Sequence, residues 1–482
     1  MNRAGAFLQA ICESPDDDAP RLIFADWLEE RGDPRGAFIR AQCVLERLDP
    51  ADPIRLELED EAQALLDRHE EEWTAPLSGL ASQWRFRRGF IEEAAISGSG
   101  FLKHGDLLSD FPITKLRIKL SREQADDVAA SPRLGRLRFL DVSSCDLRDR
   151  GVTTLLSSPH LTRLTGLDLA GNDMEGPAVR ALVESPLLGR LISLNLSHNL
   201  SLGLRALRTV SHSPAAAALQ SLGLSFTNIG LAGLRDLLSS PFLKSLTALQ
   251  GANVGGYVTG LVVPDLALLP GFSRLTALDL GGFPASAGLW RLLRSPTLGR
   301  LTSLKLSGCG LGDDDVEVLA ELPRFEGLQT LDISNNHIGP RGFERLAASE
   351  RLSGLTVLHA GRNAVRDAGA KALASSPTLT RLTALDLCNN AIGGPGIQAL
   401  AVSPNVAHLT TLDLSGNYIN LDSARSLAAS PQLRRLRELR VRGAGLPDAE
   451  ALAAILADAP DGPFTRREHG WLRRRRAAHA GL

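Results

Sequence analysis

The chain has 482 residues, 44% of them hydrophobic and 22% charged, a composition that excludes wholesale disorder. A net charge of −2 and an aromatic content of 5% argue against general nucleic-acid binding, which relies on basic surfaces and on aromatic stacking platforms. Five cysteines are too few, and odd in number, for a disulfide framework, which favours a reducing compartment.

The N-terminal region, residues 1–50, predicts a small module of three helices. The acidic run at 16–18 is expected to cap the second helix, because negative charge is favourable at a helix N-terminus. Three consecutive aspartates lack the alternating oxygen ligands of a cation-binding loop, so capping is favoured over a metal site. The second helix is expected to end at Gly32, and Asp33 and Pro34 to begin the third.

Three segments of this module resemble a known family. They are S-P-D-D-D-x-P-R-L, A-D-W-L-E-E and G-D-P-R-G-x-F-I-R, all between Phe7 and Gln42. They resemble the short repeat-companion domain found at the N-terminus of many planctomycete proteins, often beside leucine-rich repeats. The resemblance implies a bacterial protein in which the module accompanies a repeat array, and it implies no particular chemistry.

Residues 51–110 predict a connector that consists of an acidic helix followed by strand material at 84–98. Together with the module, this head carries a net charge of −11 over residues 1–110. Residues 111–136 then resemble a degenerate repeat, with Ile113, Leu116 and Ile118 as its strand. Terminal repeats are usually atypical because they shield the core.

From residue 137 onward one pattern recurs, L-x-x-L-x-L-x-x-N-x-L, at a spacing close to 27 residues. Alternating leucines predict a short strand with one buried face, and the residues that follow predict a helix. The pattern resembles the leucine-rich repeat in its helix-containing, ribonuclease-inhibitor-like form. It predicts an α/β solenoid over residues 111–462: a horseshoe with a parallel concave sheet and convex helices. The twelve copies begin at Leu137, Leu164, Leu191, Leu219, Leu246, Leu275, Leu301, Leu328, Leu355, Leu382, Leu409 and Leu436.

A Ser-Pro pair often follows the helical part of a repeat, as at 158–159 and 403–404. Proline cannot continue a helix, so the pair is interpreted as a stop signal rather than a phosphorylation site.

The ninth position of the repeat closes the turn after the strand. Its polar side chain is expected to hydrogen-bond to backbone groups of the neighbouring coil, which would otherwise be buried without partners. Cysteine replaces asparagine at this position in two repeats. The predicted turn ladder consists of Cys145, Asn172, Asn199, Cys309, Asn336, Asn363, Asn390 and Asn417.

The central strand position that points into the hollow is aspartate in six of the twelve repeats. We interpret this face as an acidic ridge suited to a basic segment of a partner protein; the alternative is that small polar residues simply suit a crowded face. The predicted contact residues are Asp141, Asp168, Asn195, Asp279, Lys305, Asp332, His359, Asp386, Asp413, Arg440 and Arg442.

Two parts of the array are irregular. Gly251 and Phe283 break the pattern within 246–290, either as tolerated drift or as a protruding contact loop. At the far end, 448–456 predicts a capping helix, and 463–482 a basic tail of net charge +5 that is solvated or frayed. Contact of this tail with nucleic acid or an acidic partner is the alternative.

The sequence carries no phosphate-binding loop, no H-E-x-x-H and no C-x-x-C, so we expect no catalytic residues, no metal and no cofactor. It also has no run of 18 apolar residues, so the expected location is the cytoplasm rather than a membrane.

We therefore expect a non-enzymatic protein-interaction scaffold. The alternative is a regulator of a partner enzyme, such as a GTPase-activating or inhibitory array. Nucleic acid is a less favoured partner than protein, and the oligomeric state is left open.

Overall fold

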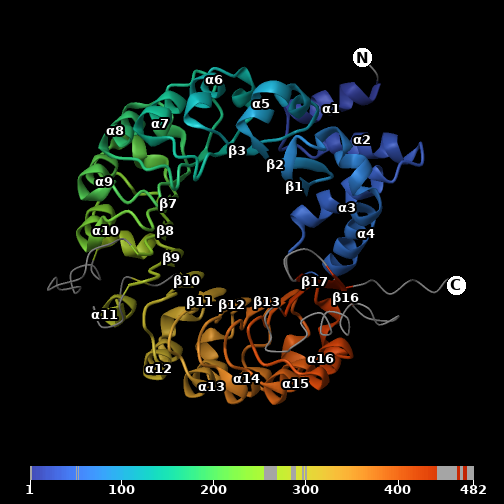
Figure 1. The fold of residues 1–482 in the computed structure, drawn as a ribbon, viewed down its shortest axis with the longest axis vertical. Helices are drawn as coiled ribbons and strands as arrows, with labels where there is room; N and C mark the ends of the chain where they lie inside the picture. Colours follow the sequence, from blue (N-terminus) through green and yellow to red (C-terminus); the bar gives the residue numbers. More distant parts are fainter. Residues whose placement is uncertain are drawn as a thin grey trace. The chain divides into compact units, whose positions relative to one another are not determined.

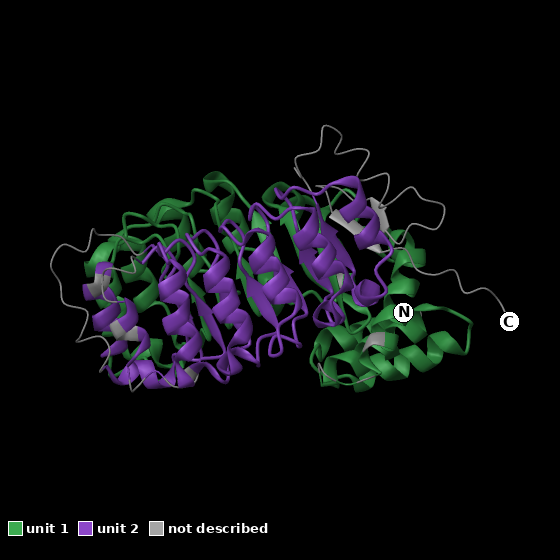
Figure 2. Cartoon of the chain, turned by 90° about the horizontal axis from the view of Figure 1, so that it is seen from below, with its two compact units in different colours: residues 1–229, 240–245 green, residues 230–239, 246–482 purple. Residues whose placement is uncertain are grey.

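The computed structural model describes residues 3–49, 52, 54–253, 269–283, 289–295, 298, 301–441, 464–466 and 471–474. The chain divides into two compact units (Figure 2). Unit 1 comprises residues 1–229 and 240–245, and unit 2 comprises residues 230–239 and 246–482.

Unit 1 begins with a helical head. Its helices are α1 (Arg3–Glu13), α2 (Ala19–Glu29), α3 (Arg35–Arg47) and α4 (Arg55–Thr74), and its hairpin is β1 (Ala81–Arg87) and β2 (Phe90–Ser97). The second helix ends at Glu29, three residues before the predicted Gly32. The N-cap residue Asp18 makes no side-chain cap hydrogen bond, but Oδ1 of Asp17 accepts the N–H of Ala19, the first residue of the helix, at 2.9 Å. Asp18 instead forms ion pairs with Arg47 and Arg88.

The apolar core of the head contains residues from both sides of the predicted boundary at residue 50. Phe90 of the hairpin packs in one buried cluster with Ile11, Phe24 and Ile39 of the first three helices. A second cluster joins Phe38 of α3 to residues of α4. The helices of residues 1–50 therefore share their apolar core with residues 55–97.

A buried ionic network joins the same two segments. Glu92 is 2% exposed, and its Oε1 accepts hydrogen bonds from Arg21 at 2.5 Å and from Arg88 at 2.9 Å. Both guanidinium groups also donate to the carbonyl oxygen of Pro15. Burial lowers the pKa of Arg21, while the charge of Glu92 acts in the opposite direction. The network explains why Pro15, Asp18 and Arg21 stand together in the acidic motif.

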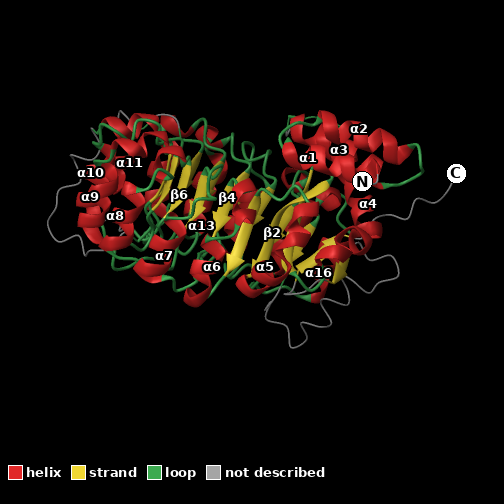
Figure 3. Ribbon diagram, turned by 90° about the horizontal axis from the view of Figure 1, so that it is seen from above, coloured by secondary structure: helices red, strands yellow, loops and turns green. Residues whose placement is uncertain are grey.

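The rest of unit 1 is a parallel sheet with helices packed along one of its two faces (Figures 1 and 3). Its strands after β2 are β3 (Lys115–Lys119), β4 (Phe139–Asp141), β5 (Gly166–Asp168), β6 (Ser193–Asn195) and β7 (Ser221–Gly223). Its helices are α5 (Gly98–His104), α6 (Ala125–Ala129), α7 (Arg148–Leu156), α8 (Gly176–Glu184) and α9 (Gly203–Ser211). Since β2 pairs in parallel with β3 and antiparallel with β1, the sheet starts two strands earlier than the predicted degenerate repeat.

Unit 2 repeats this arrangement. Its strands are β8 (Ala248–Gln250), β9 (Ala277–Asp279), β10 (Ser303–Lys305), β11 (Thr330–Asp332), β12 (Val357–His359), β13 (Ala384–Asp386), β14 (Thr411–Asp413) and β15 (Glu438–Arg440). Its helices are α10 (Gly230–Leu238), α11 (Leu289–Leu293), α12 (Asp313–Glu321), α13 (Pro340–Ala348), α14 (Arg366–Ala374), α15 (Gly394–Val402) and α16 (Leu421–Ala428).

All twelve predicted strands, β4 to β15, occur where the leucine pattern placed them. Within each unit, strand leucines pair in register with one another, as Leu304, Leu331 and Leu358 do. These leucines are fully buried between the sheet and the helices. The predicted α/β solenoid of leucine-rich repeats, preceded by a helical head, is therefore confirmed.

The Ser-Pro stop signal has a second role that the sequence analysis missed. In successive repeats the serine hydroxyl donates to a carbonyl at the end of the preceding repeat's helix, as Ser158 does to Ala129 and Ser403 to Ala374, both at 2.5 Å. Ser349 makes the same bond to Ala320 although no proline follows it. The serine is thus a link between repeats, and the proline ends the helix.

The prediction of a frayed C-terminal tail is wrong for part of 463–482. Strand β17 (Trp471–Arg474) pairs antiparallel with β15, and β16 (Phe464–Arg466) pairs antiparallel with β17. The reason is physical: an unpaired edge strand exposes backbone donors and acceptors, and a hairpin satisfies them. The predicted capping helix at 448–456 and Arg442 lie outside the described residues.

The predicted contact loop also lies mostly outside the described residues, which leave out 254–268 and 284–288. Gly251 donates its N–H to the carbonyl of Asp279, so the backbone bonding of the repeat persists without the usual leucine. Phe283 is buried at the ladder position.

Candidate functional site on the strand face

The turn ladder forms a network of buried hydrogen bonds. The side chain of Asn172 accepts the N–H groups of Cys145 and Leu147 and donates to the carbonyl of Val142, all in the preceding repeat. Asn199, Asn336, Asn363, Asn390 and Asn417 make corresponding bonds. Cys145 and Cys309 instead donate their thiols to a carbonyl of the repeat before. These ladder residues hold the coils together and do not face a ligand.

The aspartates of the strand face have a structural role that sequence reasoning missed. In each case Oδ1 accepts the backbone N–H two residues later, which turns the chain out of the strand. Asn195 makes the same bond, to Ser197 at 3.1 Å, so the bond does not require a negative charge. The bonds run from Ser143 to Asp141, Ala170 to Asp168, Gly281 to Asp279, Ser334 to Asp332, Cys388 to Asp386 and Ser415 to Asp413, at 2.8–2.9 Å.

In unit 2 the strand register places the predicted contact residues in one row. Lys305 pairs with Asp279 on one side and Asp332 on the other, and His359 pairs with Asp332 and Asp386. The row continues through Asp413 to Arg440, whose Nη1 lies 3.4 Å from Oδ2 of Asp413. Neighbouring strands are about 4.8 Å apart, so these groups interact electrostatically. The face is a row of mixed charge rather than a continuous acidic ridge.

Burial raises the pKa of two carboxyl groups on the strand faces. Desolvation raises the pKa of Asp279, against the N–H of Gly281 and the charge of Lys305, which lower it. Desolvation also raises the pKa of Asp168, whose Oδ2 accepts a hydrogen bond from Asn195.

In unit 1 the corresponding row has charged residues on its first strands and uncharged residues on its last strands. Arg117 forms an ion pair with Asp141, Asp168 follows, and Asn195 and Gly223 complete the row. The predicted contact residues of this unit therefore form many of their polar interactions with one another or with neighbouring strands of the sheet.

One backbone position beyond the strands has the same unusual conformation in all eleven repeats in which the structure describes it. The eighth residue of the repeat, which we call the rim position, is left-handed, with φ between 46° and 72°. In most repeats this conformation aims its N–H at a carbonyl of the next repeat, as in His198 to Ser225 at 2.7 Å. The rim positions are Ser144, Gly171, His198, Phe226, Asn253, Gly282, Gly308, Asn335, Arg362, Asn389 and Gly416.

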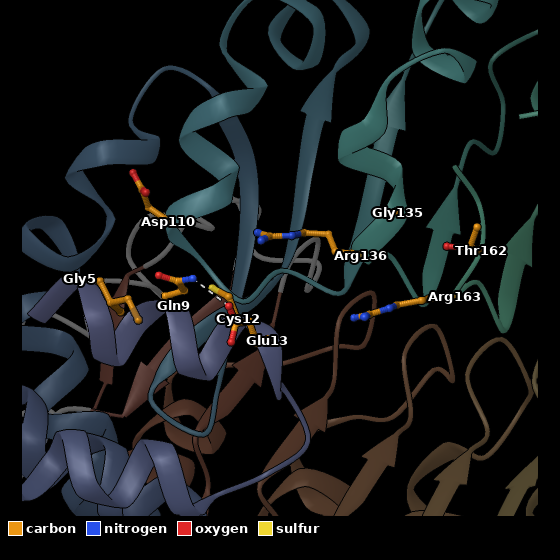
Figure 4. A pocket seen from close by; sticks show the side chains of 10 residues that line it. Gly5, Gln9, Cys12, Glu13, Asp110, Gly135, Arg136, Thr162 and Arg163 are labelled. Carbon is orange, nitrogen blue, oxygen red and sulfur yellow. Dashed lines mark hydrogen bonds between the residues drawn. The ribbon is translucent and has the colours of Figure 1, made fainter. Parts of the chain in front are cut away.

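A cavity of about 820 Å³ in unit 1 lies between α1 and the first repeats (Figure 4). Arg136 and Arg163 lie on the repeat side, and Gln9, Cys12 and Glu13 on the α1 side. Burial raises the pKa of the Cys12 thiol, so it is not an activated nucleophile. Arg136 is engaged with the carbonyls of Leu108 and Phe111. The other residues that line the cavity are Gly5, Leu8, Asp110, Gly135 and Thr162.

The described cysteines and acidic groups do not assemble a reactive centre. Burial raises the pKa of Cys388 to about 11 and that of Cys309 to about 12, so both stay protonated at neutral pH. In the described part of the chain, no group of three His, Cys, Asp or Glu residues is placed to hold a metal ion. Of the described helices, none has the length and apolarity needed to cross a membrane.

Comparison with known proteins agrees with this architecture. The Leucine Rich repeat family matches residues 137–156, 301–320, 328–347, 378–401 and 407–428. The fold and these matches define a protein built on leucine-rich repeats. No curated protein matches the sequence significantly.

Two solved structures are similar in part. One is an internalin (inlF) from Listeria monocytogenes, with 16% sequence identity over 83% of this chain and 93% of that chain and a TM-score of 0.32. The other is a chain of the Rad7 and Elc1 complex from yeast, with 16% identity over 79% of this chain and 93% of that chain and a TM-score of 0.40.

Proposed function

We propose that this chain is a non-enzymatic scaffold that binds a partner protein on its strand face, and that the partner segment on unit 2 is basic. Leucine-rich-repeat proteins generally mediate protein–protein interaction. The observation that carries the proposal is the row Asp332, His359 and Asp386, in which two carboxylates flank a histidine on adjacent strands.

The hydrogen bonding of the row supports recognition of a cation. In Asp279 and Asp332, Oδ1 accepts the hydrogen bonds that described residues donate. The Oδ2 atom of each carboxylate is therefore left for a partner. An arginine or lysine that bridges two such groups would make charge-assisted hydrogen bonds, which are stronger than neutral ones. Lys305, between Asp279 and Asp332, restricts the site to partners whose charges match the alternation.

Charge removal tests the proposal without disturbing the strand ends. D332N/D386N keeps the Oδ1 acceptor, since Asn195 already makes that bond in unit 1. Proteins captured from cell lysate by wild type and variant are quantified by mass spectrometry, and the affinity of the captured partner is then measured at 50 and 200 mM salt. We expect a loss of at least about tenfold and a weaker salt dependence.

The matched control is D168N, which removes a strand-face charge from unit 1. It should leave the captured partner unchanged. An unchanged set of partners for D332N/D386N would contradict the proposal. Deleting the head is a poorer test, because β2 pairs with β3 and its removal exposes a sheet edge.

We further propose that the repeats are of the ribonuclease-inhibitor-like type, with the head a repeat-companion domain, and that the protein works in the bacterial cytoplasm. Helices of eight or nine residues in most repeats support the first point. None of the five cysteines, all of which the structure describes, forms a disulfide, and this supports a reducing compartment.

A further inference from the structure

The rim position singles out two adjacent repeats of unit 1. The left-handed conformation is unfavourable for side chains with a Cβ, and glycine and asparagine adopt it most readily. Eight of the eleven described rim positions are accordingly glycine, asparagine or serine. The exceptions are His198, Phe226 and Arg362. Histidine tolerates the conformation better than phenylalanine does, so Phe226 is the least expected residue of the series.

His198 and Phe226 form one exposed aromatic surface. Their rings are stacked, with centroids 4.6 Å apart and an angle of 17° between the planes. Phe226 remains 37% exposed, and Leu200 in the same loop as His198 is 60% exposed. Backbone strain that serves exposed apolar side chains, rather than a buried core, points to a function in contact with another molecule.

The two segments that carry this surface contain no charged side chain. Residues 191–204 and 209–234 contain no Asp, Glu, Lys or Arg, in a chain that is 22% charged. The neighbouring strands β6 and β7 present serine, asparagine and glycine. Depletion of charge around exposed aromatic residues is the compositional mark of the centre of a protein–protein interface.

We propose that His198, Leu200 and Phe226 form a docking patch for an uncharged segment of a partner protein that inserts one apolar or aromatic side chain. Nucleic acid fits less well, because its phosphates require basic side chains and the two charge-free segments supply none. The patch rests on the proposed scaffold function but uses residues separate from the charged row of unit 2.

A stability measurement separates a docking role from a structural one. F226N places at this rim position the residue found at Asn253 of the next repeat. If Phe226 is retained for docking, the variant removes strain, and its thermal unfolding midpoint is unchanged or raised. A lowered midpoint would show that the stacked pair stabilises the fold, and would overturn the proposal.

A binding measurement identifies the occupant. A phage-displayed library of random 16-residue peptides is selected on the full-length wild type, and the enriched peptides are measured on H198N/F226N and on D332N/D386N. We expect uncharged peptides with one aromatic or large aliphatic anchor, bound at least about tenfold more weakly by H198N/F226N. The same peptides should bind D332N/D386N as they bind wild type.

Each other result is decisive. Selection of basic peptides, equal affinity for H198N/F226N, or no enriched peptide would overturn the patch while leaving the charged row of unit 2 to its own test. A parallel titration with a fluorescent poly-dT 16-mer asks whether the aromatic pair stacks on bases. Binding that H198N/F226N abolishes would assign the patch to nucleic acid and overturn the proposal.

Discussion

The strand faces of the two units have the same backbone and different chemistry. Both use the same ladder asparagines, the same Oδ1 bond at the strand end and the same left-handed rim. Yet the row in unit 1 ends in Asn195 and Gly223 beside an aromatic pair, whereas unit 2 presents Asp332, His359 and Asp386. The difference shows that the repeat fixes the frame and leaves a few side chains in each strand free to vary.

The largest expected effect concerns a feature of unit 1 alone, the buried ions of the head. E92Q removes the negative charge that Arg21 and Arg88 share, and leaves two buried guanidinium groups poorly compensated. We expect a loss of about 3–5 kcal/mol in unfolding free energy, measured by urea denaturation. The adjacent E93Q is the control, because Glu93 pairs with Lys115 near the surface and should cost less than about 1 kcal/mol.

The next prediction tests whether the frame is the same in both units. N172A in unit 1 and N390A in unit 2 each remove a fully buried amide that satisfies backbone groups of the preceding coil. We expect each to lower the unfolding free energy by about 2–4 kcal/mol, because the backbone groups left behind remain buried. Clearly unequal losses in urea denaturation would show that the two frames differ.

The smallest expected effect concerns a single charge in unit 2. Burial raises the pKa of Asp279, so the folded protein binds this proton more readily than the unfolded chain does. The charged form of Asp279 therefore lowers the free energy of unfolding at neutral pH. This destabilisation disappears as the pH falls through the raised pKa and Asp279 becomes protonated.

We accordingly expect D279N to be slightly more stable than wild type at pH 7, by less than about 1 kcal/mol. The advantage should shrink as the pH is lowered into the carboxyl range, which thermal unfolding at several pH values would follow. A variant less stable than wild type at pH 7 would show that attraction to Lys305 outweighs the cost of burial.

The leucine pattern predicts the strands well because each strand depends on residues within its own repeat. Leu304, Leu331 and Leu358 are buried because of their spacing, which is visible in the sequence. The first three helices of the head are likewise local in origin, since turn and capping residues separate them.

What the sequence did not reveal depends on contacts between distant segments. Glu92 meets Arg21 from 71 positions away, and β17 pairs with β15 from 31 to 35 positions further along the chain. The role of the strand-face aspartates was missed for another reason. An aspartate two residues before a small residue is compatible with both a ligand contact and a local turn, and Asn195 at the same position was the available clue.

The strand-end bond to Oδ1 has an evolutionary consequence. Aspartate and asparagine codons differ by one base, and both side chains offer the oxygen that the turn requires. A lineage could therefore change the charge of each strand singly, in steps of one repeat, without a folding penalty for the intermediate. Under the proposed binding on the strand face, recognition in such an array can drift toward a new partner through a series of proteins that all remain stable.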